Sequence, residues 1–486
     1  MSAAFSLLLA NPALHCTFLP DRRGANRIAQ ELSTRPDLVV KCKQRFRVLS
    51  VVDPNGPDLG EDQDKIGEEL KTHFEAYLKP VMAGDDSEKG FGIKPKVVIM
   101  DLFRGPQCMG VVQKVATELG RKEQVKLLIS LSITNMGLKL VLESNARVDA
   151  AVAEGKQLDE AVEEIASYDR IIDPLDIPAR PQWEFHPQVG SWQFDSIVPA
   201  LKMPYFFSPA FKHCDGMIIN GVPELEPKAA ATLSGLLGHP VYTIGYDPTE
   251  VSGKEDIPEL VNNPRYPTDD GRVKKFLDEC LAHYGENSVV YISLGQVGWP
   301  FRRPELIDNL VNSLLDAGIP FLFALAATDA ELTPETLAKV QASDKAEISS
   351  WVNQREVLKH SAVSTFVTHM GPSGMYESLI AGKPMIAVPQ FSQHPVNTML
   401  MTSLGCCIQL YQFSTGHDGK TFSNGVKVNS ATLMRKEMDE VWVRKRGEEG
   451  TRLRENVQKV RARIIESWER GESKKALDAL ADIISE

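Results

Sequence analysis

The feature that most constrains the fold of this chain is a repeated pair of segments, in which a short apolar run rich in Val, Ile and Leu precedes a stretch of helical character. These runs occupy residues 14–20, 97–103, 126–132 and 216–221 in the first half, and 288–295, 320–326, 364–370 and 384–389 in the second. Continuous apolar runs that alternate with helices are typical of parallel strands buried on both faces. The sequence therefore predicts an α/β fold with two parallel sheets.

The two series are separated by residues 245–267, which are rich in proline, glycine and charged side chains and are typical of a linker. A chain of 486 residues is also too long for one ordinary domain. We therefore predict domains and connections with the following bounds: a first domain over 1–245, a linker over 246–268, a second domain over 269–460, and C-terminal helices over 461–486.

Composition narrows the class of protein. The net charge of −11 and the isoelectric point near 5.5 argue against a general nucleic-acid-binding protein. Seven cysteines without a C-x-x-C pair indicate reduced thiols, as in a cytoplasmic protein. No apolar run is long enough to span a membrane. The apolar stretch at 3–10 lacks the basic residues that precede the core of a signal peptide, and we interpret it as the end of a packed helix.

The segment "FVTHMGPSGMYESLIAGKP" carries the clearest candidate site. Ligands of parallel sheets bind where strands end and helices begin, and a helix N-terminus attracts phosphate. Gly371 and Gly374 allow a phosphate to approach the backbone, while Ser373 and His369 offer hydrogen-bond donors. Glu377, one turn into the helix, has two acceptor oxygens that suit the paired hydroxyls of a ribose. The alternative is an ordinary strand–turn–helix unit with a hydrogen-bonded histidine.

The flanking sequence extends this motif into a longer pattern. "WVNQREVLKHSAVSTFVTHMG" precedes it and "ESLIAGKPMIAVPQFSQHPVN" follows it, so that the pattern runs from Trp351 to His394. This pattern resembles the sugar-donor box of the family-1 UDP-glycosyltransferases. "VVYISLG" and "DGMIINGVPELEPKAAATLSGLLGHPVYTIG" are similar to two further segments of that family. Because these motifs occur in the family's order, the resemblance covers nearly the whole chain.

The resemblance implies the GT-B fold, with two facing Rossmann-like domains and a C-terminal helix that crosses back to the N-terminal domain. It implies an inverting, metal-independent transfer of a sugar from a UDP-sugar to a hydroxyl of a small apolar acceptor, such as a phenolic or terpenoid natural product. The expected partners are the donor and this acceptor, with no cofactor, no nucleic acid and no second subunit. Residues 129–142 lie where relatives line an apolar acceptor pocket, and the alternative is that they form a core helix.

The resemblance also implies roles for individual residues. Trp351 is expected to stack on the uracil, and the backbone of Val352 to hydrogen-bond its edge. Gln354 is expected to contact the base or the ribose, and Glu377 to bind the ribose. The residues expected to bind the diphosphate are His369, Gly371, Ser373, Gly374, Gly295 and Gln296. The alternatives are that Trp351 is a core aromatic residue and that Gln354 is a surface amide.

Some positions depart from the family's pattern. Pro372, Ser373 and Gly374 stand where the family has Trp-Asn-Ser, and Gln296 stands where a serine is usual. Gln393 and His394 replace the acidic residue and glutamine that bind the sugar hydroxyls. The loss of a carboxylate removes a strong charged acceptor. The resemblance therefore leaves the identity of the donor sugar open.

The histidine that serves the family as catalytic base has no obvious counterpart in this sequence. Asp101 matches the family's catalytic aspartate, although it can instead cap a helix that starts near Gly105. The family's histidine base follows a first strand, and we predict that this chain begins after that strand; His15 is too far along to replace the base. Three readings follow: a transferase that uses Asp101 or another residue, a shortened chain, or a UDP-sugar-binding homologue without catalysis. Phosphorylases and sugar-nucleotide epimerases of the same fold are a weaker alternative.

Overall fold

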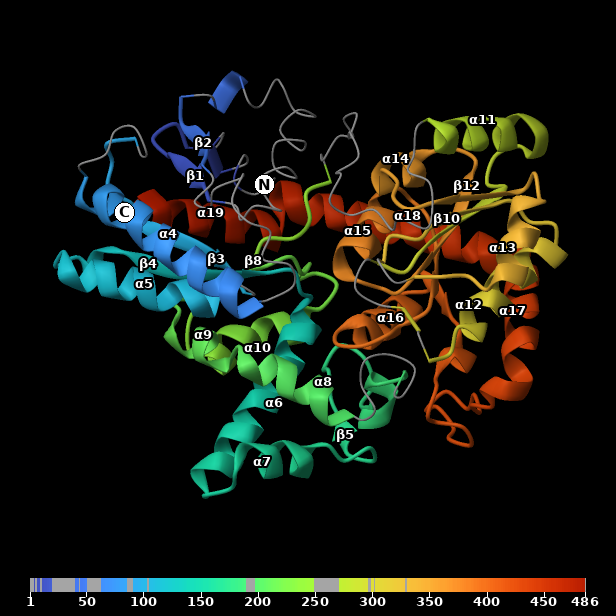
Figure 1. Cartoon of the computed structure of the whole chain (residues 1–486), viewed down its shortest axis with the longest axis horizontal. Helices are drawn as coiled ribbons and strands as arrows, with labels where there is room; N and C mark the ends of the chain where they lie inside the picture. Colours follow the sequence, from blue (N-terminus) through green and yellow to red (C-terminus); the bar gives the residue numbers. More distant parts are fainter. Residues whose placement is uncertain are drawn as a thin grey trace. The chain divides into compact units, whose positions relative to one another are not determined.

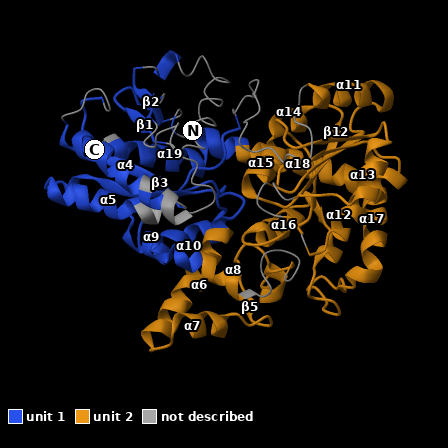
Figure 2. Ribbon diagram, in the orientation of Figure 1, with its two compact units in different colours: residues 1–135, 204–258, 465–486 blue, residues 136–203, 259–464 orange. Residues whose placement is uncertain are grey.

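The structure is a computed structural model. It describes residues 4, 7–8, 11–19, 40–42, 44–49, 63–84, 91–102, 105–188, 197–248, 271–295, 299–300, 302–327 and 330–485. Contacts divide the chain into two compact units (Figure 2). The first unit contains residues 1–135, 204–258 and 465–486, and the second contains residues 136–203 and 259–464. The contacts thus group residues 136–203 with the C-terminal half, whereas the sequence prediction placed them in the first domain. Most of the predicted linker, from residue 249 onward, lies outside the described residues.

The second unit contains a sheet of six parallel strands (Figure 1). They are β9 (Val289–Ser293), β10 (Phe321–Ala324), β11 (Ala346–Ser349), β12 (Val363–Thr368), β13 (Met385–Ala387) and β14 (Cys407–Gln409). Their spatial order is β11-β10-β9-β12-β13-β14, and all neighbours are parallel. Four of these strands were predicted from apolar runs, and β9, β10, β12 and β13 are buried along their whole length. The apolar runs missed the two edge strands, β11 and β14.

Helices connect and cover these strands. They are α11 (Arg272–Tyr284), α12 (Glu305–Asp316), α13 (Pro334–Gln341), α14 (Gln354–Lys359), α15 (Pro372–Ile380), α16 (His394–Ser403), α17 (Ser430–Arg446) and α18 (Glu448–Arg470). One apolar face of α12 and one of α17 enter the same core cluster, where the indole Nε1 of Trp442 donates to Ser313 Oγ at 2.9 Å. This bond satisfies two buried polar groups in an otherwise apolar core.

The second unit also contains α6 (Asn135–Ala153, whose first residue belongs to the first unit), α7 (Leu158–Ile165), β5 (Ile171–Ile172), β6 (Arg180–Pro181) and most of α8 (Ile197–Phe206). Residues 129–142 form the end of β4 and the start of α6, and residues 133–139 are buried. Their burial supports the core-helix alternative for this segment.

The first unit contains four parallel strands in the order β3 (Val97–Asp101), β4 (Lys126–Leu131), β7 (Gly216–Ile219) and β8 (Val241–Thr243). A separate parallel pair is formed by β1 (Cys16–Phe18) and β2 (Phe46–Val48). Its helices are α4 (Gln63–Ala83), α5 (Gly105–Glu118), α9 (Ser208–His213), α10 (Pro227–Leu237) and α19 (Glu472–Ser485). In the second unit, β9 pairs with both β10 and β12, so the six strands form one sheet. Among the described residues of the first unit, no strand connects the β1–β2 pair to the four-stranded sheet.

The C-terminal helix packs on the sheet of the first unit, as predicted. Leu477 and Leu480 of α19 are buried in one cluster with Leu128, Ile218 and Tyr242, which come from β4, β7 and β8. A helix nearly 240 residues away in sequence thus covers one face of β8. All seven cysteines are free thiols, as predicted from their spacing.

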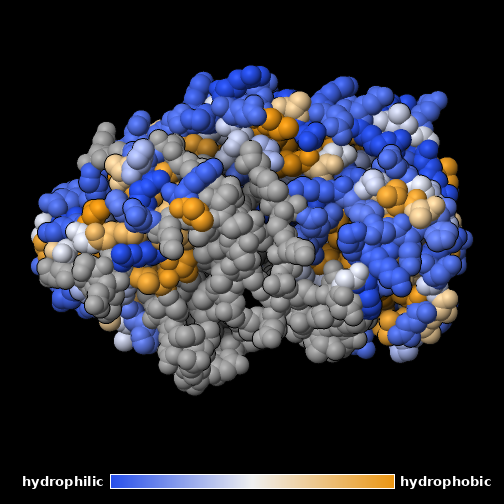
Figure 3. Space-filling model, turned by 90° about the horizontal axis from the view of Figure 1, so that it is seen from above, coloured by the Kyte–Doolittle hydropathy of each residue, from blue (hydrophilic) through white to orange (hydrophobic). Residues whose placement is uncertain are grey.

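Figure 3 shows one face of the molecule, coloured by hydropathy. In the face drawn in Figure 3, hydrophobic residues are scattered among hydrophilic ones, a pattern that is ordinary for globular proteins. Within the described part of the chain, no helix combines the length and the apolar character needed to cross a membrane.

Candidate functional site

The strand order of the second unit indicates where a ligand is expected to bind. From β9 the chain first builds one side of the sheet, adding β10 and then β11. It then returns to the other side of β9, where it adds β12, β13 and β14. The order therefore reverses between β9 and β12, which are hydrogen-bonded neighbours with Ser293 aligned to Thr368. In open parallel sheets, ligands bind at the carboxyl ends of the strands where the order reverses. Gly295 and His369 follow these two strands, so the topology brings together two residues that the sequence analysis selected.

The imidazole of His369 lies against the backbone of two glycines. A Cβ atom at Gly371 would be 2.5 Å from His369 Nε2, and one at Gly295 would be 3.0 Å from both Nε2 and Cε1. Gly295 also has a φ of +82°, a conformation that side chains other than glycine rarely adopt. Both glycines are thus needed for the ring to occupy this position.

His369 is neutral at physiological pH. Burial lowers its pKa to about 4, against a weaker opposing effect of the backbone of Ser293. Its Nδ1 atom is buried and makes no hydrogen bond to the described residues. The ring of His394 packs edge-on against it at a centroid distance of 4.7 Å, and burial together with His369 holds the pKa of His394 well below its usual range. A neutral ring carries one N–H donor, so His369 can donate a hydrogen bond without adding charge.

The next element, α15, begins directly beside this ring. Gly371 is its N-cap residue and Pro372 is its first residue, and no side chain caps the first turn. The N–H groups of a first turn have no partner within the helix and carry a partial positive charge. Ser373 is exposed in this turn, and Gly374 is buried. The predicted phosphate-binding residues His369, Gly371, Ser373 and Gly374 are therefore close together at one helix N-terminus.

Two non-glycine residues beside the predicted site residues have left-handed backbone conformations. Met370 has a φ of +69° and Ser392 has a φ of +58°. Asn397 of α16 is fully buried, and its Nδ2 donates to the carbonyl of Met370 at 2.9 Å. Strained conformations of this kind are concentrated at functional sites, where surrounding contacts hold them. The sequence analysis missed Asn397, because its partner is a backbone atom 27 positions away.

A chain of hydrogen bonds links Glu377 to the sheet. Gln354 Nε2 donates to Glu377 Oε2 at 2.6 Å, and the hydroxyl of Tyr291 donates to Gln354 Oε1 at 3.1 Å. Arg355 forms an ion pair with the other oxygen, Glu377 Oε1, at 3.2 Å. Gly374 allows this close approach, because a Cβ atom there would lie 3.3 Å from Gln354 Nε2. The structure thus joins the two predicted ribose residues and adds Tyr291 and Arg355, which the sequence analysis missed.

Trp351 and Val352 connect β11 to α14. Trp351 is half-buried, and its carbonyl accepts a hydrogen bond from Ser349 Oγ at 2.6 Å. Val352 is buried. Asn353 caps α14 by accepting from the backbone N–H of Glu356 at 3.2 Å, which ends the loop at a defined residue. Trp351 therefore stands at the carboxyl end of β11, with part of its side chain open to solvent.

The remaining predicted residues are placed as follows. Gln393 is the half-buried N-cap residue of α16, and His394 is the buried first residue of that helix. Gln296 lies outside the described residues. Asp101 belongs to the first unit, where it is the exposed last residue of β3, paired in register with Ser130 of β4. No group of three or more His, Cys, Asp or Glu side chains within the described ranges is positioned to hold a metal ion.

Comparisons with known proteins agree on one family. Residues 269–424 match the family model described as UDP-glucoronosyl and UDP-glucosyl transferase. An anthocyanidin 3-O-glucosyltransferase of Zea mays is 27% identical over 62% of this chain and 60% of its own. The UDP-glycosyltransferase eriJ of Hericium erinaceus is 29% identical over 47% of this chain and 46% of its own. The chain thus matches less than two thirds of the length of these curated relatives.

Solved structures show the same fold. A transferase from Siraitia grosvenorii in complex with UDP has a TM-score of 0.67 at 19% identity, with 100% of this chain and 97% of that chain covered. The protein Os79 from O. sativa in complex with UDP has a TM-score of 0.61 at 19% identity, with 99% and 95% covered. This likeness confirms the predicted GT-B fold class.

Proposed function

We propose that this chain, a member of the UDP-glycosyltransferase family, transfers a sugar from a UDP-sugar to a hydroxyl group of a small apolar acceptor. The observation that carries the proposal is the close placement of His369 against Gly295 and Gly371, where the strand order reverses and α15 begins. The matched family segment, residues 269–424, contains this whole arrangement.

In this proposal, the diphosphate of the donor binds at the N-terminus of α15. The free N–H groups of the first turn, the hydroxyl of Ser373 and the neutral ring of His369 supply hydrogen-bond donors. As the bond to the sugar breaks, negative charge grows on the leaving diphosphate, and these fixed donors stabilise it. We accordingly propose a reaction that needs no metal ion or other cofactor.

The nucleoside part of the donor would extend from this helix toward α14. Trp351 would stack on the uracil, the backbone of Val352 would hydrogen-bond its edge, and Glu377 would accept from the ribose hydroxyls. Arg355 and Gln354 already bind one oxygen each of Glu377, which fixes the orientation of the carboxylate. A carboxylate oxygen can accept more than one hydrogen bond, so a carboxylate held in this way suits a diol.

The transfer itself would be a single displacement at the anomeric carbon. The acceptor oxygen forms the new bond, the bond to the diphosphate oxygen breaks, UDP leaves with the bonding electrons, and the configuration inverts. The proton of the acceptor hydroxyl passes to a base, and we propose Asp101 for this role. Gln393 and His394 would lie near the donor sugar, whose identity the sequence leaves open.

Acceptor chemistry is proposed from the relatives. The names of several refer to anthocyanidins or flavonoids, which are phenolic compounds. We therefore propose a phenolic alcohol as acceptor, with a terpenoid alcohol as the alternative. The free cysteines support our proposal of a cytoplasmic location for the enzyme. The test is incubation of the chain with UDP-sugars and a panel of such alcohols, followed by mass spectrometry of the products and NMR of the anomeric configuration. UDP-sugar binding without any transfer would instead favour a binding homologue.

Replacing Gly371 with alanine tests the phosphate-binding role of His369. The backbone of Gly371, with φ −60° and ψ 143°, accepts alanine without strain, so the effect isolates the contact of the new methyl group with the imidazole. We expect UDP affinity to fall about 10- to 150-fold, because the methyl group displaces the imidazole and a hydrogen bond to a charged group contributes about 1.5–3 kcal/mol. Calorimetric titration with UDP measures the loss.

The matched control is Gly235→Ala in α10, where a Cβ atom would have no neighbour within 4 Å. This variant should keep the affinity of the unmodified chain. If Gly371→Ala also keeps it, the diphosphate does not contact His369 in the proposed way.

A further inference from the structure

A pocket lies in the second unit at the amino-terminal ends of the sheet strands, whereas the candidate site lies at their carboxyl ends. Its floor is formed by residues at the amino-terminal ends of the central strands, including Ser288 before β9, Pro320 before β10 and Ser364 near the start of β12. Its volume is about 480 Å³. Small-molecule pockets typically have volumes of about 300–1,000 Å³. The pocket is therefore large enough for a metabolite and separate from the residues assigned to UDP.

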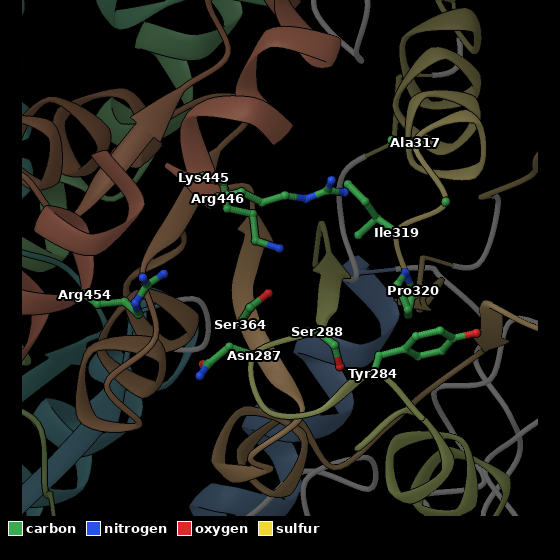
Figure 4. A pocket seen from close by; sticks show the side chains of 11 residues that line it. Tyr284, Asn287, Ser288, Ala317, Ile319, Pro320, Ser364, Lys445, Arg446 and Arg454 are labelled. Atoms are coloured by element: carbon green, nitrogen blue, oxygen red, sulfur yellow. The ribbon is translucent and has the colours of Figure 1, made fainter. Parts of the chain in front are cut away.

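The residues that line this pocket carry positive charge only. Three are basic, Lys445 and Arg446 from the end of α17 and Arg454 from α18, and none of the lining residues is acidic. Figure 4 shows these side chains around the pocket, with the Lys445 amine directed toward Ser364. Lys345 adds a further charge close by, because its ammonium donates to the carbonyl of Gly318, another lining residue, at 3.3 Å.

Two carboxylates that follow α17 in sequence are paired with other arginines. Glu449 accepts two hydrogen bonds from Arg444, both at 2.7 Å, and Glu448 pairs with Arg452 at 3.5 Å. The side chains that line the pocket are therefore left without an acidic partner in this part of the fold.

Lys445 is the most informative of the three. It is only 7% exposed, and it makes no hydrogen bond or ion pair with a described residue. Lys139, another buried lysine of the second unit, instead pairs with Glu143 at 2.9 Å. Burial, with smaller effects of Arg446 and Arg454, lowers the pKa of Lys445 to about 7. A largely buried lysine without an acidic partner is costly to the folded state, and its amine is open to the pocket, so an anionic ligand bound there would stabilise it.

The two pocket serines narrow the chemistry of that ligand. Ser288 Oγ donates to the carbonyl of Gly285 at 2.8 Å, and Ser364 Oγ donates to the carbonyl of Val289 at 2.7 Å. Each hydroxyl has used its one proton, so each can only accept from a ligand. The basic residues thus suit a phosphoryl group, and the serine oxygens suit hydroxyl groups.

We propose that this pocket binds a small phosphorylated polyol such as a sugar phosphate, with its phosphoryl group among Lys445, Arg446 and Arg454 and its hydroxyls directed to Ser288 and Ser364. The inference rests on the second unit alone and does not depend on the proposed transferase activity.

The experiment measures the affinity of the full chain for glucose 6-phosphate and for inorganic phosphate by calorimetry and ³¹P NMR. We expect both to bind, glucose 6-phosphate more tightly, and Lys445→Met to weaken both at least tenfold. Lys436→Met is the matched control, because Lys436 lies on the same helix but is exposed and pairs with Glu440 at 3.7 Å. Lys445→Arg keeps the positive charge and should retain part of the affinity.

Two further readouts separate this pocket from the UDP site. Trp351→Ala should leave glucose 6-phosphate binding unchanged, and Lys445→Met should leave UDP affinity unchanged. Absence of glucose 6-phosphate binding, or binding that is lost in Trp351→Ala and kept in Lys445→Met, would overturn the proposal. Binding of inorganic phosphate with equal affinity would overturn the polyol part of it.

Stability measurements keep the test independent of misfolding. Without ligand, Lys445→Met should melt at a higher temperature than the unmodified chain, because it removes a buried charge. The pKa of Lys445 is lower in the folded state than its usual 10.5. As pH falls from about 10 to 7, the lysine is therefore protonated in the unfolded chain before it is protonated in the folded chain, which destabilises the folded unmodified protein. The difference in melting temperature between Lys445→Met and the unmodified chain should grow over this range and stay constant below about pH 7. The charged groups that act on the amine are Arg446 and Arg454, and Tyr284 also lines the pocket. A lower melting temperature of Lys445→Met at pH 7 would show that the lysine is already compensated and would contradict the proposal.

Discussion

Asp101→Asn should lower the rate of sugar transfer by about 10²- to 10⁴-fold while UDP affinity stays nearly unchanged. A positioned general base contributes a factor of this size, and asparagine has the shape of aspartate but cannot take up the acceptor's proton. Asp101 is exposed at the end of β3, in the first unit, whereas all residues proposed to contact UDP belong to the second. Single-turnover transfer and calorimetry with UDP measure the two quantities separately.

The control for this variant is Asp482→Asn, which makes the same chemical change at an exposed position of α19 in the same unit. It should transfer sugar at the unmodified rate. If Asp101→Asn also does so, another residue is the base and Asp101 has the helix-capping role instead. If the unmodified chain binds UDP-sugar and never transfers it, the binding-homologue reading replaces the transferase.

Trp351→Ala should lower UDP affinity by about 5- to 150-fold. Base stacking on an aromatic side chain contributes about 1–3 kcal/mol per base. Trp351 lies just after β11 and is only half-buried, so a ligand can reach this residue. Trp351→Phe keeps an aromatic face and should recover much of the affinity. Calorimetry with UDP and with free pyrophosphate separates the base from the phosphates, because only UDP affinity should change.

Glu377→Gln completes this test at the ribose. It keeps one acceptor oxygen but loses the ion pair with Arg355, so it should weaken UDP and leave pyrophosphate binding intact. Unchanged UDP affinity in both the Trp351 and the Glu377 variants would exclude the proposed nucleoside position.

Much of the fold could be predicted from the apolar runs, and the exceptions have a physical cause. Strands β9, β10, β12 and β13 are buried on both faces, and burial on both faces demands continuous apolar sequence. β11 has the sequence AEIS and lies at the edge of the sheet, where one side has no neighbouring strand in the described structure. An edge strand tolerates polar residues, so its sequence gives little signal.

Within the candidate site, the sequence analysis selected residues of one local motif and missed residues whose partners are distant in sequence. His369, Gly371 and Glu377 belong to one continuous strand–turn–helix motif, whose chemistry can be read locally. Asn397 and Tyr291 act through partners 27 and 63 positions away, and no local pattern encodes such contacts. The assignment of residues 136–203 to the second unit likewise depends on packing between distant segments.

By itself, the sequence determined the alternation of strands and helices, the glycine-containing turn after β12, and the absence of an acidic residue at Gln393–His394, because each depends on neighbouring residues alone. Only the tertiary structure decided that Gly295 and Gly371 enclose the His369 ring, that Arg355 pairs with Glu377, and that Lys445 is buried without a carboxylate. These features depend on which strands become neighbours and which helix ends meet, and long-range packing sets both.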